Sequence, residues 1–69
     1  MKTANRLAEI DKDLAETNRL LEDVRAELRR APDHRRGTRW WDDRAAARQR
    51  LLRHQAELHA ERHEIASAN

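Results

Sequence analysis

The chain of 69 residues carries 41% charged side chains but a net charge of only +2, and it contains no cysteine. Its length limits it to a single domain, 1–69, and disulfides cannot stabilise it. No stretch approaches the roughly 20 apolar residues of a membrane span, and no apolar block follows the first basic residues. We therefore expect a soluble, cytoplasmic protein with no membrane partner and no secretory signal.

The residue types favour helices over disorder. Alanine, leucine, arginine and glutamate dominate, charges of opposite sign are interleaved, and glycine and proline occur once each. This composition is typical of coiled coils. Arginine outnumbers lysine by 13 to 2, which together with the 12 alanines indicates a GC-rich genome, that of a bacterium or a phage.

A heptad repeat runs through the first half of the chain. Leucine recurs every seven residues, and a second position, held mostly by smaller or β-branched residues, repeats at the same interval. This pattern predicts a helix over about 3–31 that lays one face against another helix, with Thr3 as its N-cap. The members of this leucine seam are Leu7, Ile10, Leu14, Thr17, Leu21, Val24, Leu28 and Ala31.

Pro32 marks the end of the first helix, because proline inside a helix loses a hydrogen bond and clashes with the preceding turn. The segment 32–38 is then a connection, in which Gly37 can adopt a left-handed backbone. Thr38 is a suitable N-cap for a second helix over about 39–66. Such a short connection predicts an all-α antiparallel hairpin, similar to a coiled coil. The alternative is one long helix bent at Pro32.

The second helix has a weaker apolar stripe. Leu51, Leu58 and Ile65 repeat every seven residues, with Trp40 and His54 on the same side. Two helices cannot enclose a core, so we expect each side chain of the seam to stay open on one flank. A second copy would cover that flank, which predicts a homo-oligomer, a dimeric four-helix bundle.

Charge is distributed unevenly along the chain. Residues 1–24 hold four basic and six acidic groups, 25–53 hold ten and four, and 54–69 hold one and three. Folding into a hairpin gathers the basic middle, with both tryptophans, around the connection. Arginine and tryptophan are enriched among interface hot spots, so this tip is a candidate contact site. The predicted partner-binding residues are Arg35, Arg36, Arg39, Trp40, Trp41, Arg44 and Arg48.

This pattern suggests a small, non-enzymatic interaction or regulatory protein that docks on a larger protein through the basic tip or the leucine seam. Two alternatives stay open: a nucleic-acid-binding protein that uses the same arginines, and a purely structural assembly component. Against nucleic acid, Asp33, Asp42 and Asp43 interrupt the basic stretch, and no motif of a known nucleic-acid-binding fold occurs. One tryptophan can also serve mainly to cover the end of the core.

No motif indicates catalysis, a cofactor or a metal. His59 and His63 are four residues apart, a spacing that can chelate zinc, but Arg62 beside them opposes a cation, so we expect surface histidines and no metal site. Without cysteine, and with Ser67 near a helix end, we predict no nucleophile and no enzymatic activity. His54, if buried against the seam, is a candidate pH sensor.

Overall fold

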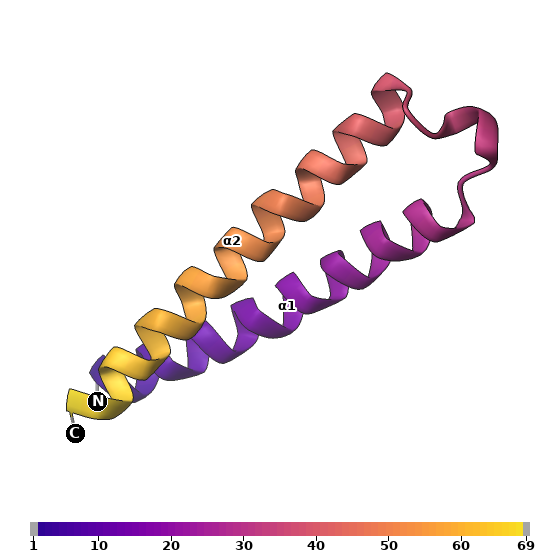
Figure 1. The fold of residues 1–69 in the computed structure, drawn as a ribbon. Coiled ribbons are helices and arrows are strands. Elements are labelled where there is room, and N and C mark those ends of the chain that lie inside the picture. Colours follow the sequence, from indigo (N-terminus) through magenta and orange to yellow (C-terminus); the bar gives the residue numbers. More distant parts are fainter. Residues whose placement is uncertain (1, 69) are drawn as a thin grey trace.

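The structure is a helical hairpin, as the heptad repeat and Pro32 predict. The computed structural model describes residues 2–68, with side chains from Ala4 onward. Helix α1 spans Lys2–Arg30, a 3-10 turn η1 spans Asp33–Arg35, and α2 spans Arg39–Ala68, with no strand among these residues. The helices lie side by side and bring both chain ends to one pole (Figure 1). The molecule is a rod measuring 51 × 14 × 13 Å.

Two local features reverse the direction of the chain in the connection: the 3-10 turn after Pro32, and Gly37. Pro32 adopts an extended backbone that ends α1, and η1 then forms with a hydrogen bond from the Arg35 amide to the Pro32 carbonyl at 2.9 Å. This 3-10 turn was not predicted from the sequence. Gly37 follows with a φ of +78°, the left-handed conformation that a side chain disfavours. The prediction for Gly37 is therefore confirmed.

Thr38 caps α2, as predicted. Its hydroxyl accepts a hydrogen bond from the Trp41 amide at 3.4 Å, and it also donates to the Arg35 carbonyl at 2.5 Å. One side chain thus satisfies a free amide of the first helical turn and ties that turn to η1. At the other end of the chain, Thr3 lies inside α1, because the helix already includes Lys2.

The leucine seam is buried within a single chain from Ile10 to Ala31, whereas Leu7 is half-buried. Ile10 is 0% exposed, Leu21 2% and Thr17 4%, and Ile10 forms a core cluster with Leu14 and Leu58. The expectation that the seam stays open on one flank was therefore wrong for these residues. A single hairpin is thus enough to bury these residues, although the apolar stripe of α2 is thin.

The weaker stripe of α2 is confirmed by its burial. Leu58 is its buried residue, whereas Leu51 and Ile65 are half-buried. His54 was predicted to lie against the seam, but it is exposed and lines an open depression beside Asp13. Because His54 is exposed at the edge of the helix pair, the condition for the predicted pH sensor, a histidine buried against the seam, is not met.

Thr17 is the polar residue of the buried seam. Its hydroxyl donates to the Asp13 carbonyl one turn earlier, at 2.7 Å. This local bond satisfies the hydroxyl without a partner on α2, so the threonine fits an otherwise apolar seam at little cost.

Ion pairs join the helices near the chain ends. Arg6 donates to both carboxylate oxygens of Glu61, at 2.5 and 2.7 Å. Arg62 donates to Asp11 at 2.8 Å. These charge-assisted bonds fix the register of the pole opposite the connection, although their partial exposure limits their contribution to stability.

The Arg6–Glu61 pair is expected to make the stability of the fold depend on pH in the acidic range. Hydrogen bonds from Arg6 hold the pKa of Glu61 below its ordinary value. A depressed folded-state pKa stabilises the fold fully above the unfolded pKa, and this stabilisation disappears as the pH falls through the lowered folded value. Between about pH 5 and 3, the unfolding temperature followed by circular dichroism should fall less in Glu61→Gln than in the original protein. An equal fall in both would contradict this role.

Candidate functional site

The two tryptophans at the start of α2 lie in two different depressions of the tip. Adjacent helical residues point about 100° apart, so Trp40 and Trp41 cannot share one surface. Trp40 lines a depression together with Pro32 and His34, and Trp41 lines another together with Leu28. The predicted tip is therefore two surfaces with different charge.

The Trp40 surface is mixed in charge. Arg35 places its guanidinium carbon 5.1 Å from the centre of the Trp40 ring. Glu27 also lines this depression and pairs with Arg44 across the helices at 3.6 Å. Trp40 is half-buried, with the buried Ala31 in the same lining. These contacts suit a residue that covers the end of the core.

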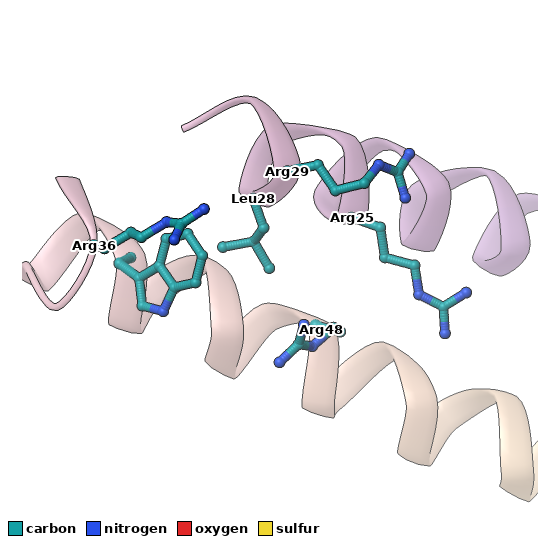
Figure 2. Close-up of a pocket in the computed structure, with 6 residues that line it drawn as sticks. Arg25, Leu28, Arg29, Arg36 and Arg48 are labelled. Atoms are coloured by element: carbon teal, nitrogen blue, oxygen red, sulfur yellow. The ribbon is translucent and has the colours of Figure 1, made fainter. Parts of the chain in front are cut away.

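The Trp41 surface is an open groove of about 400 Å³ between the ends of the helices (Figure 2). Its six lining residues come from α1, the connection and α2, and we call them together the Trp41 groove. Four are arginines, and none of the residues described in this lining is acidic. The members of the Trp41 groove are Arg25, Leu28, Arg29, Arg36, Trp41 and Arg48.

Helix geometry explains how these side chains converge. Arg25 and Arg29 are four residues apart and so share one face of α1. Trp41 and Arg48 are seven apart and share one face of α2. In Figure 2, Arg25 extends from α1 towards α2, where Arg48 lies. Arg36 comes from the connection and places its guanidinium 5.9 Å from the centre of the Trp41 ring, a cation–π contact.

The charges of the groove are poorly compensated. Across the side chains of residues 4–68, Arg25, Arg29 and Arg48 have no acidic partner within salt-bridge distance, whereas Arg36 approaches Asp33 at 3.9 Å. The Asp33 side chain is 98% exposed, so this contact contributes little. The groove is therefore a concentrated positive site.

In the alignment of the two helices, two complementary pairs along one flank are followed by two arginines. Along one flank, Asp11 pairs with Arg62 at 2.8 Å. Seven residues further on each helix, Asn18 accepts a hydrogen bond from Gln55 at 2.6 Å. The next step of seven brings Arg25 and Arg48 to the same groove, where complementary groups would stabilise the pair and like charges oppose it.

The predicted tip residues divide between the two surfaces. Arg36, Trp41 and Arg48 meet in the Trp41 groove, and Arg35 and Trp40 meet on the Trp40 surface. Arg44 is held by Glu27, and Arg39 is exposed but lines neither depression.

The acidic residues that interrupt the basic stretch in the sequence do not interrupt the groove in space. Asp42 and Asp43 are exposed and are not part of its lining, nor is Asp33. Helical rotation carries both aspartates of α2 away from the face that holds Trp41 and Arg48. The groove therefore has a more uniform charge than the sequence suggested.

Sequence reasoning missed the contribution of α1 to this site. Arg25 and Arg29 were not among the predicted contacts, and Leu28 was assigned to the seam alone. The available signal was the spacing of the two arginines, one helical turn apart on the flank of the seam. Their relation to Trp41 depends on the register between helices, which the sequence does not state.

Metal-binding and membrane-spanning features were also sought in the structure. His59 and His63 are both exposed on α2. Within residues 2–68, no group of three or more histidine, cysteine, aspartate or glutamate residues is placed to hold a metal ion. Neither described helix has a stretch long and apolar enough to cross a membrane.

The groove thus combines an aromatic side chain with four guanidinium groups, which can bind phosphate or carboxylate by paired hydrogen bonds and stack on planar groups. Function is inferred here from these charges and contacts. Searches against protein families, curated proteins and solved structures found no match to this chain.

Proposed function

We propose that the protein is a small, non-enzymatic docking protein whose basic tip binds an anionic surface of a larger macromolecule. The observation that carries this proposal is the meeting of Arg25 and Arg48 in the Trp41 groove, at the position where the flank otherwise pairs complementary groups. Like charges held together oppose folding, and an anionic partner relieves that repulsion. Binding of an anion would explain why two arginines occupy positions where a complementary pair would stabilise the hairpin more.

The charge distribution of the whole rod supports end-on docking. Residues 1–24 and 54–69 each have two more acidic than basic groups, counting histidine as neutral, and both segments run towards the pole that holds the chain ends (Figure 1). Residues 25–53, with six more basic than acidic groups, surround the connection. An anionic partner attracts the tip and repels the opposite pole, which orients the rod during encounter.

Affinity capture tests this proposal directly. The tagged protein should retain a partner from a lysate of the organism that encodes it, and Arg25→Gln with Arg48→Gln should lose that partner. The matched control is Arg50→Gln with Arg53→Gln, which removes the same charge from exposed positions outside the groove. Equal retention by the groove variant and the control would refute docking through the groove.

A dimeric four-helix bundle is a second proposal, supported by two leucines at one edge of the helix pair, beside the polar Asp13, Glu16 and His54. Leu20 is 41% exposed and shares an open depression with the half-buried Leu51. A second copy packed on this edge would bury both leucines. Sedimentation equilibrium should show a dimer that becomes a monomer in Leu20→Glu. A monomer at high concentration in the original protein would exclude the bundle and leave docking by a single hairpin.

A further inference from the structure

We infer that the partner of the Trp41 groove is a single-stranded nucleic acid, whose phosphates bind the arginines while a base stacks at Trp41. This inference rests on the proposed function, because it names the class of molecule that docks at the tip.

The charge of the groove matches a phosphate backbone. Arg25 and Arg29 are separated along α1 by about 6 Å, a spacing that successive phosphates of an extended strand can follow. Arg48 faces them from α2, so that a strand in the groove meets guanidinium groups on both sides. Single-strand-binding proteins combine such a basic groove along the backbone with aromatic platforms for the bases.

Trp41 and Arg36 supply the platform. Arg36 places its guanidinium carbon 5.9 Å from the centre of the Trp41 ring, and both residues are part of the groove lining. Bases stack on aromatic rings and on guanidinium planes in complexes with unpaired strands. Because every base has a flat face, this contact implies little sequence preference, in agreement with the lack of polar side chains other than arginine in the lining.

A protein partner is a poorer match to the same surface. Tight protein interfaces contain a desolvated core of apolar and aromatic anchors. The groove offers Trp41 for this purpose, whereas Leu28 is only 5% exposed and cannot insert into a partner. Among the described residues, the exposed large hydrophobic side chain is Leu20, which lies in a different depression. The groove thus offers a protein partner Trp41 and its arginines, but no exposed aliphatic anchor.

The aromatic contact distinguishes a single strand from a duplex. A depression of about 400 Å³ is at the small end of ligand pockets and suits a base with its phosphate. In a duplex the bases are paired and stacked, so the rigid double helix contacts the arginines without reaching the Trp41 platform.

Fluorescence anisotropy with three anionic probes tests the inference. The probes are a labelled oligothymidylate of about 16 nucleotides, a DNA duplex of the same length and a labelled polyglutamate. The oligothymidylate should bind at least about tenfold more tightly than either of the others. Trp41→Leu should weaken its binding about tenfold, the loss expected for one stacked base, and leave polyglutamate binding unchanged.

A second measurement covers the case in which Trp41→Leu fails to fold. In Trp40→Phe the remaining tryptophan is Trp41, and oligothymidylate should quench its fluorescence, whereas polyglutamate should not. Equal or tighter binding of the duplex or of polyglutamate, or a Trp41 that is neither quenched nor required, would overturn the inference.

The experiments distinguish failure of the nucleic-acid inference from failure of the docking proposal. If oligothymidylate does not bind but the original protein still captures a partner through the groove, docking at the tip stands and a single-stranded nucleic acid is excluded as the partner. If capture is also insensitive to Arg25→Gln with Arg48→Gln, the docking function itself is wrong.

Discussion

Replacing Ile10 with alanine is expected to unfold most of the protein at room temperature. The Ile10 side chain is completely buried and packs in the cluster with Leu14 and Leu58. Truncating such a residue typically costs about 2–5 kcal/mol, because the lost burial is joined by the cavity left behind. A core of this size rarely supplies more than about 3–5 kcal/mol in total. Helicity by circular dichroism, followed in a urea titration, measures the loss.

Leu20→Ala is the control for that experiment. Leu20 lies in the same helix but is 41% exposed in the single hairpin, so in a monomer its truncation should cost less than about 1 kcal/mol. A loss as large as that of Ile10→Ala would show that Leu20 is covered in solution, as the four-helix dimer requires. A small loss for both variants would contradict the assignment of the seam as the core.

Removing two arginines from the Trp41 groove is expected to weaken the binding of oligothymidylate by about a hundredfold at low salt. Each hydrogen-bonded contact between a guanidinium and a phosphate contributes about 1.5–3 kcal/mol, so losing Arg25 and Arg48 together has at least this effect. The slope of log affinity against log salt should also become shallower, by about 0.7 for each lost phosphate contact. Anisotropy titrations of Arg25→Gln with Arg48→Gln between about 50 and 200 mM salt measure both quantities.

Removing two positive charges outside the groove should weaken oligothymidylate binding less. Arg50→Gln with Arg53→Gln lowers the net charge equally but leaves the groove intact. We expect only the weak, long-range part of the attraction to decrease, with the salt slope nearly unchanged. Matching losses in both double variants would mean that net charge, and not the groove, determines binding.

The hairpin itself was predictable because each of its elements is specified locally. The heptad leucines define one face of α1, Pro32 ends that helix, and the Gly37–Thr38 pair provides the turn conformation and the cap of α2. These effects act within a few residues and depend on periodicity and backbone chemistry, which a sequence displays directly. The 3-10 turn was missed because the same short segment is compatible with several turns.

The site was only partly predictable because it depends on how the helices are aligned. Arg36, Trp41 and Arg48 were expected at the tip, but Arg25 joins them only because the ladder of Asn18 with Gln55 sets the register. The same limitation explains why seam exposure was misjudged. Whether a neighbouring helix covers a leucine is a matter of packing, and periodicity does not report it.

The docking proposal assigns Arg25 and Arg48 to binding, at a position where a complementary pair would stabilise the hairpin more. Arg25→Glu tests this claim most directly, since it would pair with Arg48 across the groove and with Arg29 one turn later on α1. We predict that the unfolding temperature, followed by circular dichroism, rises by a few degrees, as expected for about 0.5–1 kcal/mol, while binding of oligothymidylate is lost. An unchanged or lower unfolding temperature together with undiminished binding would contradict it.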